Sequence, residues 1–137
     1  MLKTNIIGKK HFAIAPVLKL DITSWDINEI MTTALDAIQG WCYKVEIETT
    51  YLGDCEAEQI ALGGTLCLYV KDDEIVHQLD LQKFLTGLRL WIEKSQNFEL
   101  EIPGRLDVWE IGFASADQII QYALFNRIVY KYFLNTL

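Results

Sequence analysis

The residues that could act as nucleophile, general base or metal ligand are few in this sequence. It has two histidines, His11 and His77, and three cysteines, Cys42, Cys55 and Cys67. A transition-metal site needs several such side chains at short spacing, and a redox pair of thiols needs a C-x-x-C motif. Neither pattern is present. The sequence therefore predicts no metal site, no catalytic residues and no cofactor.

The cysteines could still act as nucleophiles if a base or a helix N-terminus stabilised the thiolate. Cys42 and Cys67 both lie in segments expected to be strands, among large apolar residues, where an inert buried thiol is favoured over a pair with His77. We therefore expect reduced, unreactive thiols and a protein that is not an enzyme.

Aromatic residues are the remaining candidates for recognition. The chain has four tryptophans, six tyrosines and six phenylalanines, which can fill a core, stack on a planar ligand or anchor an interface. If a ligand is stacked, we expect Trp41, Tyr43 and Trp109 to hold it, with Arg105 as the nearby cation after the Pro103-Gly104 turn.

The C-terminal segment is the most apolar part of the chain. We expect one helix from a Ser-x-x-Gln capping box at residue 115 to about residue 133, with little polar circumference. Such a helix is either the central helix of the core or shares one face with another molecule. For the second case we expect an interface, and possible homo-oligomerisation, through these residues: Tyr122, Phe125, Val129, Tyr130 and Phe133.

The elements that must position these residues follow from hydrophobic periodicity and turn residues. We expect four helices. The first runs from the Thr23/Asp26 capping box to Gly40, and a short second one is closed by Gly63-Gly64. The third begins at Asp80 and the fourth spans 115–133. Strands are expected at 11–20, at 41–51 with Trp41 and Tyr43 on one face, and as hairpins over 65–70/75–79 and 98–102/106–113.

This order predicts the α+β class, a mainly antiparallel sheet of hairpins packed against three main helices. The 137 residues match one globular domain, spanning 1–137.

Charge and hydropathy limit the partners. The formal net charge is −7 and the basic residues form no long run, which disfavours nucleic acid as a partner. No apolar stretch is long enough to span a membrane and no signal peptide is indicated, so we expect no membrane association and a cytoplasmic location.

Several segments resemble a family. IMTTAL (30–35) with GWC (40–42), EQI (58–60) with GGTL (63–66), KFL (83–85) and ADQIIQYALF (116–125) are similar to small uncharacterised proteins carried by bacterial phages and other mobile elements. That family has a glycine after Leu-Phe, where this chain has Asn126. No activity is established for it, so the resemblance implies only a context, in which small acidic proteins often inhibit or sequester host defence components.

We therefore expect a non-enzymatic binding protein, a counter-defence inhibitor that acts on a host protein through protein–protein contact. Two alternatives stay open. One is a sponge that binds a nucleotide-like small-molecule signal, and the other is an acidic immunity-type inhibitor of a basic toxin.

Overall fold

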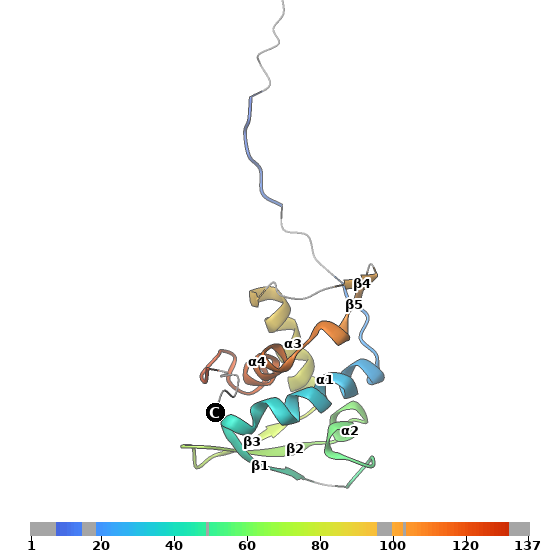
Figure 1. The fold of residues 1–137 in the computed structure, drawn as a ribbon, viewed down its shortest axis with the longest axis vertical. Coiled ribbons are helices and arrows are strands. Elements are labelled where there is room, and N and C mark those ends of the chain that lie inside the picture. Colours follow the sequence, from blue (N-terminus) through green and yellow to red (C-terminus); the bar gives the residue numbers. More distant parts are fainter. Residues whose placement is uncertain (1–7, 15–18, 49, 96–99, 103, 132–137) are drawn as a thin grey trace, which may run out of the picture.

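The computed structural model describes residues 8–14, 19–48, 50–95, 100–102 and 104–131, with only the backbone described for 100–102. Figure 1 shows the fold of these residues. The elements are α1 (Ser24–Ala37), the 3-10 turn η2 (Ile38–Gly40), β1 (Cys42–Ile47), α2 (Glu56–Ala61), β2 (Leu66–Val70), β3 (Val76–Leu79), α3 (Leu81–Ser95), β4 (Leu100–Ile102), β5 (Arg105–Leu106), the 3-10 turn η3 (Val108–Glu110) and α4 (Phe113–Phe125). The expected α+β class is confirmed, with α1, α3 and α4 as the three main helices.

The main sheet is antiparallel, in the order β1-β2-β3. On β2, Leu66, Leu68 and Val70 are buried, whereas Cys67 and Tyr69 are partly exposed. This alternation follows because successive side chains of a strand point to opposite faces. The buried side chains join one core with α1, α3 and α4, which lie to one side of the sheet in Figure 1. The hairpin expected over 65–70 and 75–79 is confirmed.

The other face of the sheet carries polar contacts between neighbouring strands. The Tyr69 hydroxyl donates a hydrogen bond to the Glu46 carboxylate, which also forms an ion pair with Lys44 at 3.3 Å. The hydrogen bond to Glu46 raises the pKa of Tyr69 to about 12. Lys44 also lies 5.0 Å from the centre of the Tyr69 ring. This face is therefore ordered by side-chain contacts across strands and is open to solvent.

A bulge in β1 changes which side chains share a face. The register with β2 shifts between Cys42 and Lys44. As a result Trp41 and Cys42 are both buried, and Tyr43 and Lys44 are both exposed. The expectation that Trp41 and Tyr43 point the same way is wrong, because the extra residue of a bulge interrupts the two-residue alternation.

The beginning of α1 follows the sequence prediction. The Thr23 hydroxyl accepts from the backbone N–H of Asp26, and the Asp26 carboxylate accepts from the backbone N–H of Thr23. The two bonds form the expected capping box. The apolar stripe of the helix is buried at Ile27, Ile30, Met31 and Ala34. Trp25 lies off this stripe and stays half exposed.

The last helix differs from the prediction at both ends. Its N-cap is Gly112, so Ser115 and Gln118 lie inside the helix and form no capping box. Its last residue is Phe125, because Asn126 adopts a left-handed conformation with φ of 61° and donates its N–H to Tyr122. The helix therefore ends eight residues before the expected residue 133; the segment 132–137 is outside the described residues.

Two expected strands are also corrected. Of the strand expected at 11–20, residues 11–14, 19 and 20 belong to no strand and 15–18 lie outside the described residues; the neighbouring Asp21 forms an isolated bridge to Arg105. The hairpin expected over 98–102 and 106–113 is confirmed as β4–β5, but its second strand ends at Leu106; residues 98 and 99 lie outside the described residues. The Asp107 carboxylate then accepts from the N–H of Trp109 and caps the turn η3, where a strand to residue 113 was expected.

The helices α3 and α4 approach each other closely at Gly87. A Cβ at this position would lie 2.6 Å from the carbonyl oxygen of Ile119 and 2.7 Å from the backbone nitrogen of Ala123. The absence of a side chain therefore allows the two helix backbones to meet at this point.

We expect Gly87→Ala to destabilise the protein by about 1–3 kcal/mol, because the added methyl group overpacks the α3–α4 contact by more than the gain in helix propensity offsets. Urea denaturation followed by circular dichroism measures the difference. Gly40→Ala is the matched control, since no atom lies within 4 Å of a Cβ there. Equal free energies of unfolding for the two variants would contradict the close approach.

Candidate binding surface

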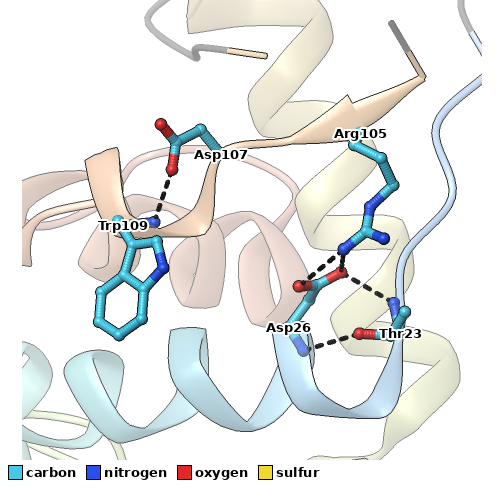
Figure 2. A network of polar contacts seen from close by, with 5 residues as sticks. All are labelled: Thr23, Asp26, Arg105, Asp107 and Trp109. Carbon is cyan, nitrogen blue, oxygen red and sulfur yellow. Dashed lines mark hydrogen bonds and ion pairs between the residues drawn. The ribbon is translucent and has the colours of Figure 1, made fainter. Parts of the chain in front are cut away.

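The N-terminus of α1 holds a partly buried ion pair. The Asp26 side chain is 1% exposed, and its two oxygens lie 3.2 and 3.4 Å from Nη2 of Arg105 on β5. Asp26 also closes the capping box with Thr23, as Figure 2 shows. One carboxylate therefore fixes the start of α1 and its contact with the β4–β5 hairpin.

The backbone adds a second connection at the same place. The N–H of Asp21 donates to the carbonyl of Gly104 at 2.8 Å, and Asp21 bridges Arg105 in parallel register. Gly104 has a φ of +83°, a conformation that glycine adopts without strain. The segment before α1 and the hairpin are thus held together by main-chain and side-chain bonds.

Two exposed tryptophans lie beside this network. Trp109 on η3 and Trp25 in the first turn of α1 meet edge to face, with ring centres 5.6 Å apart and an interplanar angle of 60°. Trp109 is 71% exposed and Trp25 is 50% exposed. The Asp107 cap holds the backbone of Trp109, as Figure 2 shows. We call this pair, with the neighbouring carboxylates Glu29 and Glu110, the Trp25–Trp109 surface.

The surface has an acidic character. Glu110 follows Trp109 directly and is exposed, and Glu29 lies one helical turn after Trp25 on α1. The nearby cation Arg105 is already paired with Asp26. The arrangement is able to offer two aromatic rings within a negatively charged rim.

A second polar network is buried at the other end of α1. Trp41 Nε1 donates to the Asp117 carboxylate, which also accepts from the Gln121 amide at 2.7 Å. Asp117 is fully buried, and loss of hydration raises its pKa against the lowering effect of these two bonds. The Trp41 ring stacks on Tyr130 with centres 5.5 Å apart and planes within 4°.

Both the nitrogen and the oxygen of the Gln121 side-chain amide are hydrogen-bonded in this network. Its Nε2 also donates to the carbonyl of Tyr130, and its Oε1 accepts from the backbone N–H groups of Val129 and Tyr130, each at 2.8 Å. The Tyr130 hydroxyl donates to the carbonyl of Lys71 at 3.2 Å. The chain after α4 is therefore fixed against Trp41 and the β2–β3 turn.

The four residues expected to stack a ligand are not brought together. Arg105 and Trp109 lie near the N-terminus of α1, but Trp41 is buried just after its C-terminal end. Tyr43 is 62% exposed beside Tyr69 on the β1–β2 side of the sheet. Trp41 is engaged with Tyr130 and Asp117, so its ring is not exposed to a ligand.

The expected interface residues also have partners within the chain. Phe125 and Tyr130 pack on Trp41, and Tyr122 is partly buried against the core. Val129 is exposed, and Phe133 lies outside the described residues. Of the two readings of the last helix, its described part corresponds to the central helix of the core; an interface through these residues stays a prediction.

The sheet separates His77 from Cys67. His77 pairs with Leu68 on the buried face and bonds the Asp73 carboxylate at 2.8 Å, whereas Cys67 points to the opposite face. Burial raises the pKa of Cys42, and burial with the charges of Glu48 and Glu46 raises that of Cys67.

These surroundings disfavour a thiolate at either cysteine. Among the residues that the structure describes, no group of three or more His, Cys, Asp or Glu side chains is arranged to hold a metal ion. In the same part of the chain, no helix has the length and apolarity needed to cross a membrane.

Sequence reasoning missed Trp25, Asp26 as an ion-pair partner, and the Asp117–Gln121 pair. The exposure of Trp25 could have been predicted, because this residue lies off the apolar stripe of α1. A polar pair in α4 could also have been predicted, since Asp117 and Gln121 are four residues apart and interrupt the most apolar segment of the chain. Their distant partners, Trp109 for Trp25, Arg105 for Asp26 and Trp41 for Asp117, could not.

Comparisons with protein-family models, curated proteins and solved structures find no match to this chain.

We expect Arg105→Met to cost about 1–3 kcal/mol, because the buried Asp26 carboxylate loses its charged partner. The variant should also weaken the exciton coupling between Trp25 and Trp109 in far-ultraviolet circular dichroism, since the ion pair positions the segment leading to η3. Urea denaturation and the difference spectrum against Trp109→Phe provide the two readouts.

Arg89→Met is the matched control, since Arg89 forms an exposed ion pair with Glu93 and should change stability little. An Arg105→Met variant with unchanged stability and unchanged coupling would show that the ion pair does not hold this surface.

We expect Asp117→Asn to change how stability depends on pH. Because the pKa of Asp117 is raised by folding, its contribution to stability is fully present below the ordinary pKa of about 3.9 and is lost as pH rises through the raised value. Asparagine does not titrate, so the stability of wild type relative to Asp117→Asn should fall over that range. Urea denaturation at several pH values tests this, with Glu110→Gln as an exposed control; a difference that rises with pH would contradict it.

Proposed function

We propose that this protein acts by binding a partner protein through the Trp25–Trp109 surface. The observation that carries the proposal is the pair of tryptophans, half to three-quarters exposed, in contact with each other at the start of α1. Tryptophan is enriched among the few residues that supply most of the binding energy in protein interfaces.

The cost of ordering these rings on binding is small. Trp109 stands on a capped turn, and Trp25 stands in the first turn of a helix fixed by a capping box. A side chain that is already held in place loses little conformational entropy when a partner covers it. Burial of the apolar area of both rings can then contribute to the binding free energy with little entropic loss.

Charge indicates the kind of partner. Glu110 directly follows Trp109, Glu29 lies one helical turn after Trp25, and the whole chain has a net charge of −7. A partner with a basic rim around an apolar patch would be attracted over a distance, and the association rate should fall with added salt. This electrostatic character favours a protein over a nucleic acid.

The resemblance to small proteins of phages and mobile elements suggests the biological role. We propose that the partner is a host defence protein and that the contact blocks it, as a counter-defence inhibitor would. An immunity-type inhibitor of a basic toxin would use the same surface, and the identity of the captured partner separates the two.

A small-molecule sponge is the alternative. A planar signal could stack on an exposed tryptophan, but the set of Trp41, Tyr43 and Trp109 is not assembled into one site. Native mass spectrometry of the purified protein would reveal a bound mass under this alternative.

We expect Trp25→Ala/Trp109→Ala to abolish partner capture without unfolding the protein. Loss of two interface anchors should weaken binding by about 2 kcal/mol or more for each, roughly 30-fold each. The measurement is a quantitative pull-down from host extract with tagged wild type and variant, followed by biolayer interferometry of the captured partner at two salt concentrations.

Tyr43→Ala is the control, since Tyr43 is an equally exposed aromatic on the sheet. Capture that survives the double tryptophan change and is lost in Tyr43→Ala would contradict the proposal, because it would place the binding surface on the sheet.

A further inference from the structure

The contact between Trp25 and Trp109 leaves indole faces open to a partner. The two rings meet edge to face, with an interplanar angle of 60°, and Trp109 is 71% exposed. The face of an aromatic ring carries the negative part of its quadrupole, and the edge carries the positive part. A cation is therefore attracted to an open ring face, and the attraction is strongest for tryptophan.

Among the described residues, no cation lies over either indole face. Figure 2 shows the Arg105 guanidinium turned toward the Asp26 carboxylate, which lies 3.2 Å away. In the same part of the chain, the cation that does lie over an aromatic ring is Lys44, at Tyr69 on the sheet. The two exposed indoles are thus open to a cation that comes from another molecule.

Two carboxylates near the rings also have no ion-pair partner within the described ranges. Glu110 directly follows Trp109 and is exposed. Glu29 lies four residues after Trp25 on α1, and side chains at this spacing are neighbours on a helix surface. The ion pairs that the described residues form involve other carboxylates. Open ring faces and unpaired carboxylates together favour a ligand that is planar and positively charged.

We propose, building on the proposed role of the Trp25–Trp109 surface in partner binding, that the partner residue seated on this surface is an arginine. Its planar guanidinium stacks on the Trp109 face, and the N–H groups along its edge donate to the Glu110 and Glu29 carboxylates. A lysine ammonium is a compact, strongly hydrated charge and gains less from a flat ring. The positive charge of the partner therefore lies over the rings as well as around them.

The test uses the full chain and short Gly/Ser peptides that carry arginine, lysine or citrulline at the same positions. Citrulline keeps the shape of arginine and lacks its charge. The indole N–H resonances in two-dimensional NMR compare the exposed Trp25 and Trp109 with the buried Trp41 and Trp91. We expect shifts at the two exposed indoles only. The arginine peptide should bind about fivefold more tightly than the citrulline peptide or better, with the lysine peptide between them.

Two variants separate stacking from charge. Trp109→Leu keeps an apolar side chain but removes the indole face, so it should abolish the preference for arginine over lysine. Glu29→Gln/Glu110→Gln keeps both rings and should weaken binding of the arginine peptide by about threefold or more. Tyr43→Leu removes an exposed aromatic ring on the sheet and is the matched control, with no expected effect. Circular dichroism checks that each variant is folded.

Equal affinity for the arginine and citrulline peptides would overturn the proposal, as would peptide binding that leaves the Trp25 and Trp109 resonances unshifted. A preference for arginine over lysine that survives Trp109→Leu would overturn it as well. If partner capture still depends on the two tryptophans in these cases, the binding surface stands and only the arginine contact is wrong. Capture that survives Trp25→Ala/Trp109→Ala would contradict the binding surface and the arginine contact together.

Discussion

The structure depends on one buried carboxylate. Asp117 lies in the second turn of α4 with no exposure to water, and it accepts hydrogen bonds from Trp41 and Gln121, which are themselves buried. A charge-bearing group in such a place is costly unless its hydrogen bonds are made. Its two donors therefore fix where the chain leaves α1 and where it returns after α4, and the stack of Trp41 on Tyr130 follows from both.

The two ends of α1 thus lie in different surroundings. Its C-terminal end leads into the buried Trp41 and closes the core, whereas its N-terminal end displays Trp25 on a base made of Asp26 and Arg105. Burying one aromatic residue and exposing another at opposite ends of one helix requires separate polar networks. Each network uses a buried aspartate, and each ties together segments far apart in the sequence.

Local rules predicted the fold class, the capping box at Thr23 and Asp26, and the hairpin of β2 and β3, because capping, periodicity and turns act within a few residues. They failed where a single residue changed the geometry. Asn126 ended α4 in a left-handed conformation, and the bulge before Lys44 turned Tyr43 away from Trp41.

The candidate site was predicted only in part for a related reason. Trp109 and Arg105 were chosen for their side-chain types, and the structure places them in one region. Their partners Trp25 and Asp26 are about 80 residues earlier in the chain. Contacts at that separation are set by tertiary packing, which periodicity does not encode.

The missing side chain at Gly87 also governs how the molecule can move. With the backbone of α4 against this residue, sliding α3 along its neighbour would drive the bulky Phe84 or Trp91 into main-chain atoms. Packed interfaces of this kind hold one arrangement and resist gradual displacement. The two helices should then move as one rigid body when the protein forms a complex.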